Sequence, residues 1–274
     1  MGDDTNFNIT SIEGLDSLPD LTIGMAPKPR RHGSWLGGKL AQKRVISMGF
    51  QIMGDPEDGY RTTRPKNQLV NACQIQDVES PLIFDLGEGE DPVMINASVT
   101  ALDLPIVAGY TRLRTGVVEF TATDPMKYSV EKKIGQAAPP LPPVASPYGQ
   151  QYGFAYEEET GITGSFTAKN EGNSPSAAVY RIDGPVERPV ITLLDKDGTR
   201  ATTFAVNLTE GETLMVDTVR NSVTVNGADA FKTASGALVA DLVIRPGDTV
   251  ISFNGTVPFG GNPRLNVSWR DASR

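Results

Sequence analysis

Apolar and polar residues alternate along much of this chain, and a period of two residues predicts β-strands. In the last run of this kind, Leu265, Val267 and Trp269 alternate with polar neighbours. Ile251 and Phe253 alternate in the same way in the run before it. A strand with this pattern has one apolar and one polar face. We therefore expect the C-terminal part of the chain to form an antiparallel sheet that packs on one face.

Turn signals separate the strand-like runs of this C-terminal part. Pro246-Gly247 fits a type II turn, because glycine tolerates the positive φ that this turn requires. Arg220-Asn221 and Asn226-Gly227 can close tight turns on either side of a short run. The whole chain holds 28 glycines and 20 prolines. Short strands joined by tight turns are typical of a mainly β protein.

The N-terminal half continues the alternation. Strands are expected at residues 44–52 and 116–123, and residues 81–86 and 93–99 predict a hairpin around an acidic turn. The residues that share the apolar faces of the first two strands are Ile46, Met48, Phe50, Ile52, Val118, Phe120 and Ala122. These strands give the N-terminal half an apolar core of its own.

One helix is predicted, over residues 65–76. The positions that recur there at helical spacing are Leu69, Ala72, Cys73 and Gln76. Thr62 or Thr63 can cap the helix, and a proline is tolerated in its first turn. We expect Cys73 to face the core as a small apolar residue, not to act as a reactive thiol.

A proline-rich stretch at residues 136–150 predicts a stiff, extended spacer between two domains. The predicted N-terminal domain covers residues 1–135, and the predicted C-terminal domain covers residues 151–274. Phe204 and Leu208 add a further apolar face to the second domain.

The composition narrows the classes of function. A formal net charge of -8 argues against sequence-specific binding of nucleic acid. Cys73 is the single cysteine, so no intrachain disulfide forms, and assembly in a reducing cytoplasm is compatible with the sequence. The N-terminal residues do not resemble a secretory signal, and no window approaches the ~20 apolar residues that span a bilayer. No membrane insertion is expected.

One segment reverses the acidic character of the chain. Residues 27–44 contain six basic residues and no acidic residue. The segment fits either a solvated flexible loop or a contact arm with a tryptophan anchor, because arginine and tryptophan are enriched at interface cores. Under the second interpretation, the candidate contacts with another subunit are Arg30, Arg31, Trp35 and Lys39.

No catalytic, cofactor-binding or metal-binding residue is predicted. His32 is the only histidine, so a metal site built on several histidines is excluded, and no G-x-S-x-G motif is present. The stretch Asp195-Lys-Asp197-Gly198 begins like a calcium loop, but Arg200 occupies the sixth position, where that loop needs glycine. A hairpin turn is expected there instead.

Several short motifs recur in a characteristic order. Residues 211–218 read GETLMVDT, residues 223–227 read VTVNG, and residues 246–255 read PGDTVISFNG. The chain closes with VSWRDA, and residues 120–128 read FTATDPMKY at the end of a predicted strand. Together these motifs resemble the distal tail protein (Dit) family of long non-contractile-tailed bacteriophages, over almost the whole chain.

The resemblance implies a mainly β fold with two parts. The N-terminal part would be a split β-barrel with one α-helix, which forms the ring. The C-terminal part would be a β-sandwich of the galectin-like or carbohydrate-module kind. The implied role is structural: a ring, usually of six subunits, that joins the tail tube to the host-recognition baseplate around the DNA exit channel. The implied partners are further copies of the chain, the tail tube protein, hub or fibre proteins and the tape measure protein. The implied location is the tip of the virion tail, after assembly in the host cytoplasm.

Two other functions stay open at this point. A carbohydrate-binding module could attach the virion to cell-wall glycans, but such sites need exposed aromatic side chains. Trp269 lies in an alternating apolar row and is expected in the core, whereas Tyr148, Tyr152 and Tyr156 have no assigned place. A glycosidase would need two carboxylates across a cleft, which the sequence cannot locate.

Overall fold

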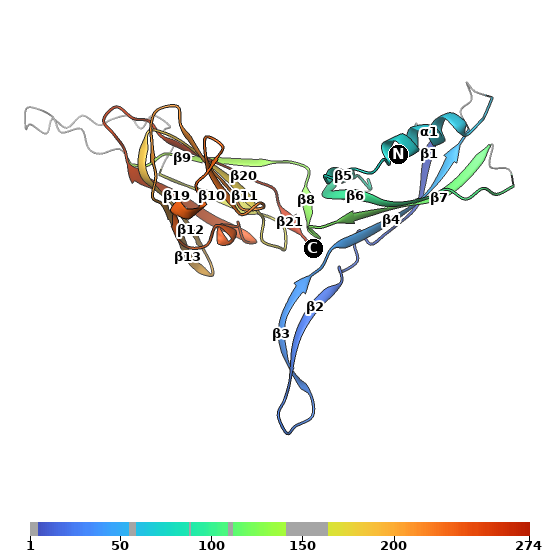
Figure 1. Ribbon diagram of the computed structural model, residues 1–274, viewed down its shortest axis with the longest axis horizontal. Coiled ribbons are helices and arrows are strands. Elements are labelled where there is room, and N and C mark those ends of the chain that lie inside the picture. Colours follow the sequence, from blue (N-terminus) through green and yellow to red (C-terminus); the bar gives the residue numbers. More distant parts are fainter. Residues whose placement is uncertain (1–4, 55–58, 88, 109–111, 141–163) are drawn as a thin grey trace, which may run out of the picture. The chain divides into compact units, whose positions relative to one another are not determined.

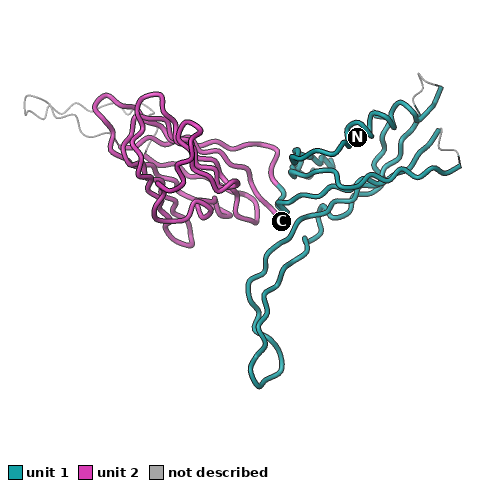
Figure 2. The backbone as a smooth tube through the Cα atoms, viewed as in Figure 1, with its two compact units in different colours: residues 1–127, 274 teal, residues 128–273 magenta. Residues whose placement is uncertain are grey.

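A computed structural model describes residues 5–54, 59–87, 89–108, 112–140 and 164–274. The chain divides into two compact units (Figure 2). Unit 1 contains residues 1–127 and Arg274, and unit 2 contains residues 128–273. Both units are built mainly from antiparallel strands, which confirms the predicted mainly β fold class.

Unit 1 is a curled antiparallel sheet with one helix (Figure 1). Its strand order is β1-β4-β7-β6, and β5 pairs with β6. The elements are β1 (Phe7–Glu13), β4 (Arg44–Met53), β5 (Ser80–Phe84), β6 (Val93–Asp103), β7 (Leu113–Ala122) and α1 (Thr63–Ala72). The strands expected at 44–52 and 116–123 and the hairpin at 81–99 are therefore confirmed.

The core of unit 1 lies on the apolar face of β4. Ile46, Phe50 and Ile52 are almost completely buried. Val118 of β7 packs with Phe50 and Ile52. Leu69 of α1 joins the same cluster, so the helix covers this face of the sheet. The alternation in the sequence predicted which side chains point inward.

The helix is shorter than predicted. It begins at Thr63 and ends at Ala72, whereas the sequence predicted residues 65–76. Thr62 is the N-cap residue, although its side chain makes no capping hydrogen bond. The reason for the early end is visible in the sequence: Gln76 stands where the next core-facing residue would be, so a further turn would bury no apolar surface.

A separate two-stranded ribbon leaves unit 1 between β1 and β4. It consists of β2 (Leu21–Pro27) and β3 (Ser34–Ala41), which pair with each other and with no other strand in the described part of the chain. Figure 1 shows it as a long blue hairpin extending away from the sheet of unit 1.

Unit 2 is a sandwich of two antiparallel sheets. One sheet has the order β10-β19-β12-β13-β18, with β14 paired to β12, and the other has the order β17-β16-β15-β11-β20-β9. The strands of the first sheet are β10 (Ser165–Asn170), β12 (Val186–Asp195), β13 (Gly198–Phe204), β14 (Asn207–Leu208), β18 (Ala234–Gly236) and β19 (Gly247–Thr256). The strands of the second are β9 (Lys133–Ala137), β11 (Ala178–Asp183), β15 (Thr213–Asp217), β16 (Ser222–Val225), β17 (Ala228–Asp229) and β20 (Arg264–Trp269). The remaining short elements are β8 (Lys127–Ser129), β21 (Ala272–Ser273) and the 3-10 helices η2 (Phe231–Thr233) and η3 (Val239–Asp241).

The C-terminal strands do not form the single sheet that the sequence predicted. β15, β16 and β20 belong to one sheet of the sandwich, and β19 belongs to the other. Their apolar faces meet in one core, in which Leu265 and Val267 pack with Ile251 and Phe253. A period of two residues marks an inward face but does not say which sheet carries it, and this explains the error.

The predicted turns at Asn226-Gly227 and Pro246-Gly247 are confirmed by backbone conformation. Asn226 and Gly227 both have positive φ, as a two-residue hairpin turn requires. Gly247 also has a positive φ, of 96°. Asp195 pairs with Gly198 across the β12–β13 turn, so this stretch is a hairpin and not a calcium loop.

The boundary between the two compact units falls between residues 127 and 128. It lies N-terminal to the boundary that the sequence predicted at residues 136–150. β9 contains the end of the predicted N-terminal domain and the start of the predicted spacer, and it pairs with β20 of unit 2. Residues 141–163, which include most of the predicted spacer, lie outside the described residues. Whether each unit folds independently stays a prediction.

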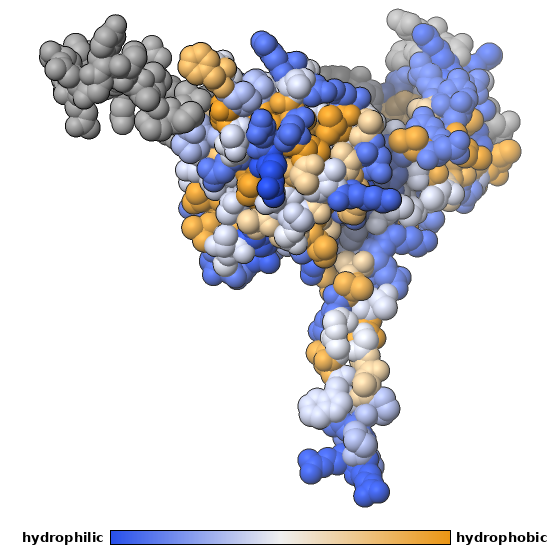
Figure 3. All heavy atoms as spheres, turned by 60° about the vertical axis from the view of Figure 1, so that its left-hand side comes forward, coloured by the Kyte–Doolittle hydropathy of each residue, from blue (hydrophilic) through white to orange (hydrophobic). Residues whose placement is uncertain are grey.

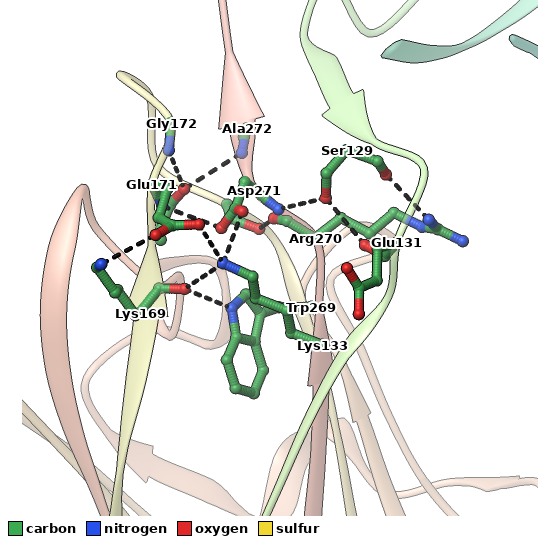
Figure 4. A network of polar contacts seen from close by, with 12 residues as sticks. Ser129, Glu131, Lys133, Lys169, Glu171, Gly172, Trp269, Arg270, Asp271 and Ala272 are labelled. Atoms are coloured by element: carbon green, nitrogen blue, oxygen red, sulfur yellow. Dashed lines mark hydrogen bonds and ion pairs between the residues drawn. The ribbon is translucent and has the colours of Figure 1, made fainter. Parts of the chain in front are cut away.

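A polar network joins the first and last segments of unit 2 (Figure 4). The Nζ atom of Lys133 lies 2.7 Å from Oδ2 of Asp271 and 3.1 Å from Oε2 of Glu171. The Arg270 Nη1 group donates to the carbonyl of Ser129 at 2.9 Å. These contacts fix residues 128–133 against the C-terminal strand segment.

Candidate functional site

The most distinctive feature of unit 1 is the hairpin of β2, β3 and the turn between them, which we call the basic hairpin. Lys28 N donates to the carbonyl of Gly33 at 3.1 Å and closes the turn. The strands approach closely at Gly37, where an added Cβ would lie 2.8 Å from the carbonyl oxygen of Gly24. Glycine at this position therefore allows the two strands to pair.

The basic hairpin exposes apolar side chains along its stem. Met25, Trp35, Leu36 and Leu40 are each more than 60% exposed. Figure 3 shows apolar and neutral residues along the narrow projection and hydrophilic residues at its end. A ribbon of two strands has no core in which to bury such residues, and isolated hairpins are marginally stable in water. Clustered exposed apolar residues on a soluble protein mark an interaction surface.

Positive charge surrounds this apolar stem. Arg30, Arg31 and Lys39 are exposed, and the Nζ atom of Lys28 lies 4.9 Å from the centroid of the Trp35 ring. The structure thus brings all four predicted contact residues, Arg30, Arg31, Trp35 and Lys39, onto one hairpin. Their contact with another subunit stays a proposal.

Arg44 does not belong to the contact surface, although it was counted in the basic segment. Its side chain is buried and donates to three backbone carbonyl groups through Nη1 and to a fourth through Nε. The acceptors are Gly14, Leu15, Ser17 and Pro125, at 2.7 to 2.9 Å. Burial lowers the pKa of Arg44, and the nearby charge of Asp16 acts in the opposite direction. Arg44 anchors the base of the hairpin instead of extending its charged surface.

Residues 1–127 are divided between the acid-free segment 27–44, which contains most of the basic hairpin, and an acidic remainder. Residues 1–127 hold 17 acidic and 12 basic residues, and six of the basic residues lie in segment 27–44. The remainder of 1–127 therefore has 17 acidic and six basic residues, a formal charge of -11. Residues 67–111 contain seven acidic residues and no lysine, arginine or histidine. This acidic segment was not among the sequence predictions, although a count of charged residues along the chain reveals it.

Within the described residues, no group of three or more His, Cys, Asp and Glu side chains could hold a metal ion. His32 is exposed in the turn of the basic hairpin. Cys73 is partly buried beside the core of unit 1, and burial raises the pKa of its thiol. Among the described helices, none has the length and apolar character that a membrane span requires.

Trp269 is a core residue, as predicted. Only 6% of its surface is exposed, and its ring stacks on Phe166 with 6.2 Å between the centroids. Its Nε1 group donates to the carbonyl of Lys169 at 3.1 Å. Trp269 therefore cannot serve as an exposed platform for a sugar ring. The three tyrosines at 148, 152 and 156 lie outside the described residues.

Comparison with solved structures identifies the fold. No protein-family model matches the sequence, and no curated protein matches it significantly. The crystal structure of SPP1 Dit (gp 19.1), a hub adsorption protein of phages that infect Gram-positive bacteria, superposes with a TM-score of 0.62. The match has 14% sequence identity and covers 97% of this chain and 93% of SPP1 Dit. The chain has a Dit-like fold.

Two structures of the phage P2 baseplate in its activated conformation also match, one with calcium and one with strontium. Their TM-scores are 0.45 and 0.46, with 13% and 14% identity. Each match covers 96% of this chain and 91% of the baseplate chain. The Dit-like fold agrees with the resemblance seen in the sequence motifs.

Proposed function

We propose that this chain is a structural protein of a phage tail tip, where it forms a ring between the tail tube and the host-recognition apparatus. The observation that carries the proposal is the Dit-like fold, which extends over 97% of the chain and so includes both units. A structural role needs no catalytic group, and the proposed function is not enzymatic.

Opposite charges on one unit support self-association. The basic hairpin holds four basic and no acidic residues, whereas the rest of residues 1–127 has 17 acidic and eight basic residues, a formal charge of -9. The basic hairpins of two copies therefore repel each other, whereas the basic hairpin of one copy attracts the acidic surface of another. Such head-to-tail contacts produce a closed ring when the rotation between neighbours closes. A ring of six copies is proposed from the resemblance to the Dit family.

The acidic character of the chain also suits a DNA exit channel. A wall of the same sign as phosphate keeps DNA from adhering while it passes. The proposed partners are further copies of the chain, the tail tube protein, the tape measure protein and hub or fibre proteins. The proposed location is the virion tail tip, after assembly in the host cytoplasm.

Labelling of intact virions tests this proposal. Antibodies against the purified protein, bound to gold particles, should decorate one end of the phage tail in electron micrographs. Antibodies against the major capsid protein serve as the control and should decorate the head alone. Purified virions that contain none of this protein would contradict the proposal.

A further inference from the structure

A cavity of about 730 Å³ opens in unit 1 beside the segment that leads into the basic hairpin. Its lining residues are Ile12, Glu13, Gly14, Leu15, Asp16, Ser17 and Leu86. Leu86 comes from the loop between β5 and β6 and is 46% exposed. The cavity thus combines an apolar wall with polar groups, and Arg44 holds its loop in place through the carbonyls of three lining residues.

Carboxylates dominate the charge near this cavity. Glu13 and Asp16 line it, and Asp16 is paired with Lys127 at 2.8 Å. The loop that carries Leu86 lies within the stretch 67–111, which has no basic residue. Further exposed carboxylates of this loop are those of Asp85, Glu90 and Asp91. The guanidinium of Arg44 is buried behind the cavity loop and adds no charge to the exposed edge.

We propose that this cavity receives the basic hairpin of a second copy of the chain. The exposed Trp35 and Leu36 supply apolar surface for the Leu86 wall, and Arg31 supplies positive charge for the carboxylates at the edge. Arginine and tryptophan are the residues that most often anchor protein interfaces. This inference rests on the proposed ring and assigns the two surfaces that join neighbouring copies.

The hairpin of the same chain cannot fill the cavity. β3 has eight residues and pairs with β2 along its length. At about 3.3 Å per residue, the far end of this strand lies roughly 25 Å from its base. The cavity lies at the base, and the exposed tryptophan and arginines lie toward the far end. Each copy therefore carries one hairpin and one cavity. Heterologous contacts of this kind produce a ring when the rotation between neighbouring copies closes.

Disulfide trapping in the full-length protein tests the contact directly. In a Cys73→Ser background, one protein carries Ser34→Cys in the hairpin and a second carries Ser17→Cys in the cavity. The oxidised mixture should give a covalent dimer, and a chain with both changes should give a ladder that ends at the ring size. A matched control pairs Ser34→Cys with Thr115→Cys, which is exposed on β7 away from the cavity lining, and should give no ladder.

Charge exchange supplies a second readout. The double change Arg31→Glu and Lys39→Glu should lower association about tenfold or more, because it places like charges together. The added changes Glu13→Lys and Asp85→Lys should restore most of it. Far-ultraviolet circular dichroism and a thermal melt confirm that each variant folds.

The outcomes separate this inference from the proposed ring. One outcome is a ring of normal mass, no disulfide between the cysteines introduced at positions 34 and 17, and no recovery of association after charge exchange. This outcome overturns the cavity as the docking site but leaves the proposal of a ring intact. Failure of the unmodified protein to associate at any concentration overturns both.

Discussion

At the scale of single residues, Arg44 shows that a basic side chain can follow the inward face of a strand. It is basic and ends the acid-free segment 27–44, although it was not among the four candidate contact residues. Its position has the same parity as Ile46, Met48 and Phe50, however, so it belongs to the inward face of β4. The alternation predicted the apolar core residues, and it could have predicted this buried cation too.

Replacement of Arg44 by methionine should destabilise unit 1 by about 3 kcal/mol or more. The change removes four hydrogen bonds to backbone carbonyls and leaves these acceptors without a charged donor. Urea unfolding, followed by circular dichroism, measures the loss. The matched control is Lys43→Met, at an exposed neighbouring position. This control should change stability by less than about 0.5 kcal/mol. Equal effects of the two changes would contradict the anchoring role.

Asp195 gives unit 2 a stability that depends on pH. Its side chain is 2% exposed and contacts Arg200 and Arg245. Burial acts to raise the pKa of Asp195, but the backbone amide of Asp197 and the two guanidinium groups outweigh burial and lower it below its usual 3.8. The folded state therefore binds this proton less readily than the unfolded state. The resulting stabilisation is present above pH 3.8 and disappears as the pH falls through the folded pKa.

Comparison of the natural chain with Asp195→Asn tests this dependence. The natural chain should be more stable between about pH 5 and pH 7, and the difference should shrink as the pH falls below about 4. Urea unfolding at a series of pH values measures it. The control is Asp197→Asn, because the Asp197 side chain is 52% exposed. Solvent screens an exposed carboxylate, so this control should have a smaller effect. A difference that grows toward low pH would contradict a lowered pKa of Asp195.

At the scale of elements, the strands with a buried face were predictable and the basic hairpin was not. β4 and β7 alternate because one of their faces packs on a core. β2 and β3 are exposed on both faces, so selection for burial imposes no alternation on them. The helix was found but placed too far toward the C-terminus, because helical spacing was extended through the polar Gln76.

Reversal of charge on the basic hairpin should prevent assembly without unfolding the protein. The triple change Arg30→Glu, Arg31→Glu and Lys39→Glu replaces positive by negative charge on an exposed element that contributes no residue to the buried core. The thermal midpoint should stay within a few degrees of that of the natural chain, while association is lost. Analytical ultracentrifugation measures the association. Replacement of the same residues by glutamine should give an intermediate loss. Normal assembly of the glutamate variant would show that the hairpin is only a solvated loop.

At the scale of the whole molecule, the order of the motifs predicted the Dit-like fold although each motif alone is short. The unit boundary was less predictable. Proline-rich composition marked residues 136–150, but the pairing of β9 with β20 is a contact distant in sequence, which composition does not reveal. The assignment of β15 and β19 to different sheets was hidden for the same reason.

This boundary has a consequence for fragments of the protein. A fragment of residues 128–274 should fold as a monomer, because it keeps β9 and the Lys133 contacts with Asp271 and Glu171. A fragment of residues 150–274 should melt at a lower temperature, because it lacks this edge strand. Differential scanning calorimetry compares the two. Equal melting temperatures would show that β9 contributes nothing, and a ring formed by either fragment would contradict the assignment of assembly to unit 1.

The central claim is that the chain is a ring-forming subunit, and the mass of the purified full-length protein in solution tests it most directly. Light scattering coupled to size-exclusion chromatography should give six times the mass of one chain at low ionic strength. The assembly should dissociate as salt screens the contact between the basic hairpin and the acidic cavity. A monomer at every protein concentration and salt concentration would contradict the claim.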